Sequence, residues 1–199
     1  QVTIQGNVEK YFNQPGLKTT TSYNWGGTGG TGGGEVEDGQ VIYTGLAQSA
    51  AECDWTFDNV TMPTELSYIW KWTEYNGNHY LNGSAYLDKV AYAAESYAVS
   101  PEIDLTAVTS ATASFEHAAK FQTTLTTLCG FAVRESGASD WTPVAIPTWP
   151  AAGSWTFVNS GSIDLSAFAG KKIQVGLKYG SSASGADTWE IRNFKVTGK

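Results

Sequence analysis

Apolar and polar residues alternate with the two-residue period of β-strands over much of this chain. The pattern is clearest over residues 172–179, where every second position is apolar: Ile173, Val175, Leu177 and Tyr179. A second alternating run covers residues 189–196 and slips by one residue at Arg192-Asn193, which predicts a β-bulge. No window of eleven residues carries the apolar stripe of an amphipathic helix. The pattern therefore predicts an all-β protein.

Shorter strand-like runs, separated by turn residues, fill the rest of the chain after residue 40. They are expected at Val41–Thr44, Trp55–Val60, Tyr68–Trp72, His79–Leu87, Glu95–Ser100, Ala111–Phe121, Thr126–Arg134, Trp141–Ile146, Trp155–Val158 and Ser162–Leu165. Residues 164–170 are expected to form a single helical turn that Asp164 caps. Many short strands at this spacing are typical of a jelly-roll β-sandwich.

The composition divides the chain into three parts. Residues 1–25 hold alternating runs around the turn at 13–16 and are expected to form an N-terminal β-hairpin segment. Seven of the nine residues from Gly26 to Gly34 are glycine, a composition that cannot build a core, so residues 26–40 are expected to be a Gly-rich linker. Residues 41–199 carry the remaining strands and are expected to fold as the sandwich.

Composition and charge narrow the classes of function. Only 16% of the residues are charged, whereas 13% are aromatic and eight are Trp, which is typical of an extracellular all-β module. The net charge of −7 argues against an electrostatic grip on nucleic acid or on an anionic membrane surface. No run approaches 18 consecutive apolar residues, so the sequence predicts no transmembrane helix.

The two cysteines, Cys53 and Cys129, are far apart in the chain and neither belongs to a Cys-x-x-Cys pair. A zinc site built on such pairs is therefore not expected. Two interpretations remain open at this point. The cysteines form a disulfide, which would stabilise the fold by about 4 kcal/mol in the chain-entropy treatment, or they are two small buried apolar side chains.

Four stretches, in the right order, resemble motifs of one family. Residues 95–105, Glu-Ser-Tyr-Ala-Val-Ser-Pro-Glu-Ile-Asp-Leu, resemble the W-L-I-S-P-x-I-D-L signature of choice-of-anchor J domains. Those domains are relatives of the cleaved adhesin domains of secreted bacterial haemagglutinins and proteases. Residues 113–119, 162–171 and 188–196 resemble the family's L-S-F-x-H-A strand, its v-D-L-S-a-y-a-G-k turn and its final strand. The resemblance covers roughly residues 41–198.

The resemblance implies a jelly-roll β-sandwich of the galactose-binding-like type. It also implies a secreted or cell-surface protein of Bacteroides-type bacteria, tethered through an upstream lipoprotein region, with an accessory role in binding or adhesion. Several relatives are thought to hold a structural calcium between the first and last strands, and Asp187, Glu190 and Asn193 are the weak candidates here. Arg192 stands where the family has an acidic residue, which opposes a cation. Residues 2–22 also resemble the closing strands of an OB-type barrel. They are either a remnant of a preceding domain or further strands at the sandwich edge.

The segment from residue 70 to residue 80 offers the residue types that bind sugars. Aromatic faces lie under the C–H groups of a sugar ring, while amides and carboxylates form hydrogen bonds with its hydroxyls. The candidate ligand-binding residues are Trp72, Glu74, Tyr75, Asn76, Asn78, His79 and Tyr80.

An alternative interpretation places part of this segment in the core. Tyr68, Trp70 and Trp72 are two residues apart and share one face of a strand, so at least Trp70 is expected to be buried. A second aromatic group, spaced by prolines, is expected to consist of buried loop anchors; it comprises Trp141, Trp149 and Trp155.

The sequence gives little support to catalysis. His79 and His117 are the only histidines, and no Gly-x-Ser-x-Gly elbow accompanies them. Asp187 and Glu190, three residues apart, would lie on opposite faces of a regular strand, unlike the paired carboxylates of a glycosidase. We therefore expect a non-catalytic, monomeric, secreted or cell-surface module that binds a glycan or a cell-surface protein. The alternatives are a structural spacer or assembly domain of a larger surface protein, and an accessory domain of a secreted nuclease or other hydrolase.

Overall fold

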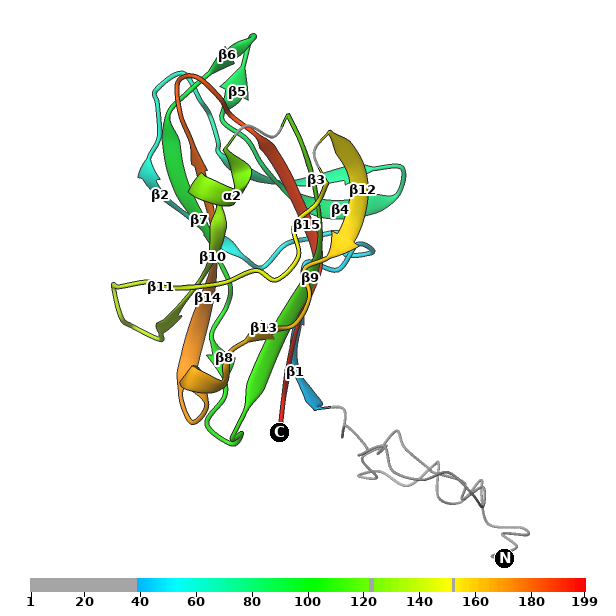
Figure 1. The fold of residues 1–199 in the computed structure, drawn as a ribbon, viewed down its shortest axis with the longest axis vertical. Coiled ribbons are helices and arrows are strands. Elements are labelled where there is room, and N and C mark those ends of the chain that lie inside the picture. The colour runs from blue at the N-terminus through cyan, green and yellow to red at the C-terminus, as the bar shows by residue number, and fades with distance from the viewer. Residues whose placement is uncertain (1–38, 122–123, 152) are drawn as a thin grey trace, which may run out of the picture. The chain divides into compact units, whose positions relative to one another are not determined.

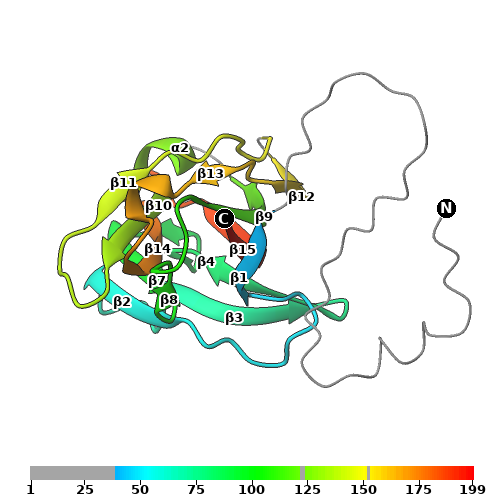
Figure 2. The ribbon, with the colours of Figure 1, turned by 90° about the horizontal axis from the view of Figure 1, so that it is seen from below.

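The computed structural model describes residues 39–121, 124–151 and 153–199. Their strands form two antiparallel sheets that face each other (Figures 1 and 2). The expected β-hairpin segment at residues 1–25 and the linker up to residue 38 lie outside the described residues. Gln40, the last linker position, already belongs to the first strand, β1.

The larger sheet, which we call sheet A, has seven strands and lies on the right in Figure 1. Its main path runs in the order β12-β9-β15-β4-β3, with β1 paired to β15 and β13 paired to β9. The bounds are β1 Gln40–Gly45, β3 Trp70–Tyr75, β4 Asn78–Gly83, β9 Ala111–Lys120, β12 Ser154–Asn159, β13 Ile163–Asp164 and β15 Thr188–Gly198.

The second sheet, sheet B, has six strands in the order β11-β10-β14-β7-β2, with β8 paired to β14. The bounds are β2 Thr56–Thr61, β7 Ala94–Val99, β8 Ile103–Asp104, β10 Gly130–Glu135, β11 Thr142–Val144 and β14 Lys172–Ser181. A separate two-stranded ribbon joins β5 (Tyr86–Leu87) to β6 (Val90–Ala91), and the short helices are α2 (Leu125–Leu128) and η1 (Ser166–Phe168). This architecture confirms the predicted all-β jelly-roll sandwich.

The inner faces of the two sheets form one aromatic-rich core. On β14 the four alternating apolar residues of the sequence pattern are all fully buried, as predicted: Ile173, Val175, Leu177 and Tyr179. From sheet A, Trp70 packs edge-on against Tyr179 with ring centroids 5.9 Å apart, and it also contacts Trp189 at 6.0 Å. Trp70 is therefore a core residue, as the alternation predicts.

The β-bulge predicted at Arg192-Asn193 is confirmed. The pairing of β15 with β9 shifts between Arg192 and Lys195, and Asn193 adopts a left-handed backbone with a φ of 52°. The predicted turn after β13 is also confirmed, because Asp164 Oδ1 accepts the backbone N–H of Ser166 at 2.9 Å at the start of η1.

Two predicted strands are wrong in part. The segment Thr126–Arg134 begins as helix α2, because Leu125 and Cys129 lie one helical turn apart and both bury their side chains. The run His79–Leu87 is broken after Gly83. Gly83 faces Trp70 across β3 and β4, and a Cβ atom at Gly83 would lie only 2.7 Å from the Trp70 ring.

Both cysteines are free. Cys129 is buried, and burial raises the pKa of its thiol to about 12, while Cys53 is half-buried. The interpretation as small apolar side chains therefore describes Cys129, and no disulfide joins the pair.

His117 on β9 is a fully buried polar residue of the core. Its Nδ1 accepts a hydrogen bond from Trp189 Nε1 at 3.2 Å, because an indole N–H only donates. Its Nε2 therefore carries the proton and donates to the Thr148 carbonyl at 2.9 Å. Both ring nitrogens of a neutral imidazole are satisfied, so His117 fastens the loop before β12 to the core.

Candidate functional site

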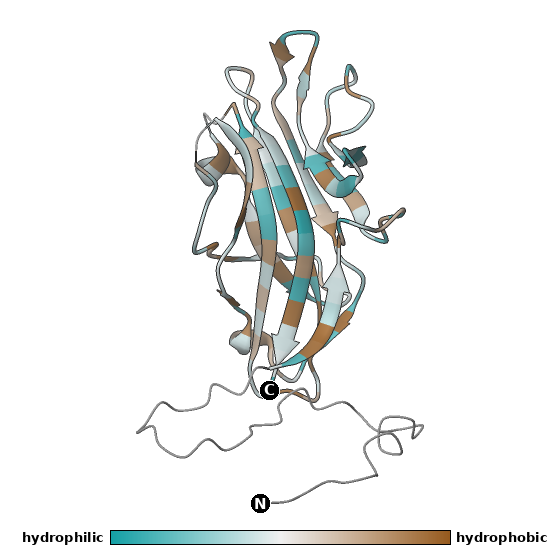
Figure 3. Cartoon of the chain, turned by 90° about the vertical axis from the view of Figure 1, so that its right-hand side faces the viewer, coloured by the Kyte–Doolittle hydropathy of each residue, from teal (hydrophilic) through white to brown (hydrophobic). Residues whose placement is uncertain are grey.

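The outer face of sheet A carries the polar half of each alternating strand. In Figure 3, which looks onto the right-hand side of Figure 1, hydrophilic and hydrophobic segments alternate along the long strands. On β15, Trp189 and Ile191 point inward and are fully buried. Glu190 lies between them and Arg192 follows Ile191, so both belong to the outer face. On β4, the buried Leu81 lies between two outer residues, Tyr80 and Asn82, in the same way.

A groove of about 410 Å³ lies on this face, and we call it the outer groove. Its size falls within the usual range of small-ligand sites. Three elements line it: the β3–β4 hairpin with Tyr75, Asn76, Asn78 and Tyr80, strand β12 with Trp155 and Phe157, and strand β15 with Glu190 and Arg192.

The hairpin turn fixes one end of the outer groove. Asn76 and Gly77 form the two-residue loop between β3 and β4, and both have positive φ values, 52° and 73°. This is the geometry for which an Asn-Gly pair is best suited. The turn sets Tyr75 opposite Asn78, and the Asn78 amide donates to the Asn76 carbonyl at 3.2 Å.

Aromatic rings form the apolar part of the outer groove. Tyr80 and Phe157 have ring centroids 6.0 Å apart, and the Arg192 guanidinium lies 3.9 Å from the Phe157 centroid. Tyr75 is 68% exposed and Trp155 is 42% exposed, so both offer large ring surfaces to solvent. Exposed rings of this size mark a binding surface when they gather at one place.

Glu190 is the carboxylate of the outer groove, and its environment is unusual. Burial raises its pKa to about 7, while a hydrogen bond with Tyr80 and the charge of Arg192 each act to lower it. The Arg192 charge is shared, because its Nε donates to Glu116 Oε2 at 2.8 Å. Near neutral pH the Glu190 carboxyl therefore exists in both its protonated and its ionised form.

The structure separates the seven candidate ligand-binding residues into two groups. Four of them line the outer groove: Tyr75, Asn76, Asn78 and Tyr80. The other three alternate with these on the hairpin and lie on its opposite face: Trp72, Glu74 and His79. Trp72 stacks on His79 with ring centroids 5.9 Å apart and planes inclined by 10°, and His79 Nε2 lies 3.3 Å from Glu74 Oε2.

Trp155 is not the buried anchor that the sequence predicts. It lies on β12 at the surface and lines the outer groove, with the Lys120 ammonium 5.7 Å and the Phe121 ring 6.3 Å from its ring centroid, and it stays 42% exposed. Trp141 and Trp149 do pack against the protein. Trp141 stacks on Tyr97 at 4.9 Å, and Trp149 lies over the core ring of Trp189 at 5.7 Å.

Sequence reasoning missed four groove residues as ligand-binding candidates: Trp155, Phe157, Glu190 and Arg192. A signal was present, because Trp155 and Phe157 are two residues apart in a predicted strand and so share a face. What the sequence does not show is that β12, β15 and the hairpin come together on one sheet.

The proposed calcium position between the first and last strands does not fit a cation. Asn193 Oδ1 accepts the Gln48 backbone N–H at 3.2 Å, and its Nδ2 donates to Glu116 Oε2 at 3.2 Å. The same Glu116 carboxylate is paired with the Arg192 guanidinium. A positive side chain therefore already occupies the carboxylate that a cation would need.

The remaining metal candidates are placed elsewhere. Asp187 Oδ2 accepts hydrogen bonds from the backbone N–H and hydroxyl of Thr124 at 2.9 and 3.1 Å, and Glu190 faces the outer groove. Across residues 39–121, 124–151 and 153–199, no three His, Cys, Asp or Glu side chains are grouped so as to hold a metal ion. Within the same ranges, no helix has the length and apolar character needed to cross a bilayer.

Comparison with known proteins gives similarities of structure only. No family model matches the sequence, and no curated protein matches it. The structure is similar to the K1 cleaved adhesin domain of Lys-gingipain from Porphyromonas gingivalis W83, with 13% identity and a TM-score of 0.48 over 79% of this chain and 98% of that one. It is similar to the K3 cleaved adhesin domain of the same protein, with 12% identity and a TM-score of 0.49 over 79% and 97%.

A third similar structure is a carbohydrate-binding module from Cellvibrio mixtus lichenase 5A, solved in complex with cellotriose. The identity is 15% and the TM-score is 0.39, over 80% of this chain and 99% of that chain. Cleaved adhesin domains are the relatives of choice-of-anchor J domains that were named with the sequence motifs. The narrower resemblance to choice-of-anchor J domains stays a prediction.

Proposed function

We propose that this chain is a non-catalytic binding domain that takes up a glycan in the outer groove. The observation that carries the proposal is the gathering of four aromatic side chains with amide, carboxyl and guanidinium groups in one groove. Tyr75 and Trp155 supply exposed ring faces for the C–H side of a sugar. Asn76, Asn78 and Glu190 supply acceptors and donors for its hydroxyls.

The rigidity of the groove supports the same proposal. Tyr80, Glu190 and Arg192 come from the centre of sheet A, where β4 and β15 are paired on both sides. Tyr80 packs against Phe157 and Arg192 is paired with Glu116, so these side chains are already held before a ligand binds and lose little conformational freedom on binding. Sugars bind weakly per contact, so a preformed surface of this kind favours them.

The small number of carboxylates in the groove supports a non-catalytic role. Hydrolysis of a glycosidic bond ordinarily uses two carboxyl groups on either side of that bond. Among the described residues that line the outer groove, Glu190 is the only Asp or Glu. We therefore assign Glu190 to hydrogen bonding of the ligand and not to acid catalysis.

We also infer an extracellular or cell-surface setting, in which the domain acts in adhesion. Its support is the low share of charged residues and the resemblance of residues 95–105 to a motif of surface proteins. The domain would then attach a larger protein to a glycan-bearing surface, an arrangement in which several weak sites on one chain act together.

A glycan-array screen followed by isothermal titration calorimetry tests the proposal. The double variant Tyr75→Ala, Trp155→Ala is expected to lose binding, whereas Phe57→Ala is expected to bind normally. Phe57 is a suitable control because it is 40% exposed and lies on β2 of sheet B, away from the groove. A folded wild-type protein that binds no glycan would overturn the proposal and favour the spacer or assembly role. Equal binding by the double variant would place the site elsewhere.

A further inference from the structure

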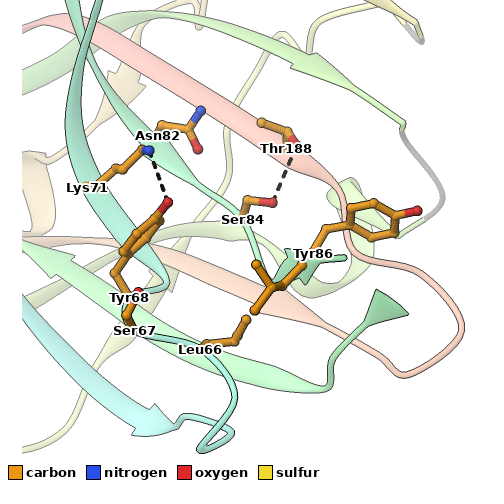
Figure 4. Close-up of a pocket in the computed structure, with 9 residues that line it drawn as sticks. Leu66, Ser67, Tyr68, Lys71, Asn82, Ser84, Tyr86 and Thr188 are labelled. Atoms are coloured by element: carbon orange, nitrogen blue, oxygen red, sulfur yellow. Dashed lines mark hydrogen bonds between the residues drawn. The ribbon is translucent and has the colours of Figure 1, made fainter. Parts of the chain in front are cut away.

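A second hollow lies on the same face of sheet A as the outer groove, and we call it the far pocket. It has a volume of about 250 Å³, and Figure 4 shows its side chains. Its lining includes Tyr68, Lys71, Asn82, Ser84, Tyr86 and Thr188. Tyr68 and Tyr86 are exposed, so this pocket also presents aromatic rings to solvent beside amide and hydroxyl groups.

Hydrogen bonds within the far pocket hold its polar groups in place. The Lys71 ammonium donates to the Tyr68 hydroxyl at 3.0 Å and lies 4.8 Å from the Tyr68 ring centroid. The hydroxyls of Ser84 and Thr188 are 3.5 Å apart (Figure 4). The pocket therefore combines donors and acceptors with ring faces, as the outer groove does.

The register of sheet A makes the two hollows continuous. Asn82 of the far pocket is the direct cross-strand partner of Glu190 of the outer groove. Opposite residues of antiparallel strands have their Cβ atoms about 5 Å apart. Along each strand the hollows also follow one another at two-residue spacing, with Tyr80 before Asn82 on β4 and Thr188 before Glu190 on β15.

The combined surface is long compared with a single sugar ring. From Asn78 at the hairpin to Ser84 after the end of β4 is six residues, or about 20 Å at the ordinary rise of a strand. Aromatic rings stand at both ends, Tyr75 at one and Tyr68 and Tyr86 at the other, while the register of β12 with β9 places Trp155 beside the middle of the track. Amide, carboxyl and hydroxyl groups lie between them.

We infer that the outer groove and the far pocket are two parts of one binding track, and that the ligand is a linear oligosaccharide lying along β4. This inference rests on the proposed glycan binding. Rings at the two ends stack on different sugar units, while Asn82 and Glu190 bind hydroxyls of the units between them. A terminal monosaccharide or a disaccharide would fill only the outer groove.

The track predicts that affinity depends on chain length. Contacts in the far pocket are made only by a ligand long enough to reach it, so they add to the affinity of long chains alone. We expect a hexasaccharide to bind more tightly than the matching disaccharide by on the order of tenfold, which corresponds to about 1.4 kcal/mol. A site confined to the outer groove would bind the hexasaccharide and the disaccharide with equal affinity.

The test is titration calorimetry with disaccharides and hexasaccharides of β-1,4-linked glucan, xylan and mannan. The double variant Tyr68→Ala, Tyr86→Ala is expected to bind the hexasaccharide about tenfold more weakly and the disaccharide as wild type does. Lys71→Ala is a second far-pocket variant that removes no ring. Tyr75→Ala, Trp155→Ala weakens binding of both lengths, and Phe57→Ala changes neither.

The outcomes separate the inference from the proposal on which it rests. Equal affinity for both lengths, unchanged by either far-pocket variant, overturns the track and leaves glycan binding in the outer groove standing. The track is supported if the far-pocket variants bind the hexasaccharide more weakly than wild type does and bind the disaccharide equally well. If the folded wild type binds none of these oligosaccharides and no glycan on the array, both the binding track and glycan binding in the outer groove are overturned. Thermal unfolding of each variant shows that the loss is not one of folding.

Discussion

Acid is expected to destabilise the sandwich through His117. This side chain is fully buried and neutral, held between Trp189 and the Thr148 carbonyl. Burial lowers its pKa from the ordinary 6.5 to about 4, and the hydrogen bond to Thr148 offsets only part of that effect. As the pH falls below 6.5, the His117 imidazole becomes protonated in the unfolded chain but stays neutral in the folded protein. The free energy of unfolding therefore decreases until about pH 4.

The size of the effect follows from the two pKa values. Their separation corresponds to roughly 3 kcal/mol in total. Between pH 7.5 and pH 5, where most other carboxylates stay ionised, the loss is about 2 kcal/mol. Glu190 acts in the opposite direction, because its pKa is raised and the folded protein binds its proton first as the pH falls from 7. The Glu190→Gln variant removes this opposing contribution and is the right background for the measurement.

Urea unfolding of Glu190→Gln at pH 7.5, 6.5, 5.8 and 5 measures the change in free energy directly. Proton NMR supplies a second measurement, because the chain has two histidines and a His79→Gln variant assigns the remaining imidazole signal to His117. An unfolding free energy that stays constant from pH 7.5 to pH 5 would refute the reasoning. A His117 signal that titrates near pH 6.5 in the folded protein would refute it as well.

Three further predictions concern packing, the groove and metal. Gly83→Ala is expected to lower the free energy of unfolding by about 1–3 kcal/mol, because the added Cβ would lie 2.7 Å from the buried Trp70 ring. Gly130→Ala is the control: its added Cβ has open space, so the free energy of unfolding measured in urea should change by less than about 0.5 kcal/mol. Glycan affinity is expected to rise about fivefold from pH 6 to pH 8 as Glu190 ionises and accepts stronger hydrogen bonds, and Glu190→Gln should show no such rise by calorimetry. Added calcium or a chelator should leave the melting temperature unchanged, since Arg192 is paired with Glu116, the carboxylate that Asn193 contacts. A rise of several degrees with calcium would contradict that argument.

The fold could be predicted because the core residues recur at every second position along the strands. Residues 173, 175, 177 and 179 of β14 all carry apolar side chains that are fully buried, so the alternation identifies both the strand and its buried face. The slip at Arg192-Asn193 located the bulge for the same reason. Helix α2 was missed because one turn of four residues is too short to show a helical period.

The candidate site was predicted only in part, and the reason is also physical. The hairpin residues Tyr75 and Tyr80 are near one another in sequence, so a local pattern could group them. Trp155 and Glu190 join them through pairing of β12, β9, β15 and β4, which are distant in the chain. Alternation also showed which side of the hairpin Trp70 occupies, yet it left open which of the two alternating sets would face the ligand.

The pairing of β1 with β15 has a mechanical consequence. Gln40, where the domain begins, is the ladder partner of Gly198, next to the end of the chain. Tension applied through these two ends would pull on the same end of one antiparallel pair. The ladder hydrogen bonds would then open one after another, as in unzipping, and not all together, as in shear. An adhesive domain loaded in this way would yield at low force from its first strand, while the hairpin and β12 that line the outer groove lie outside the first bonds to break.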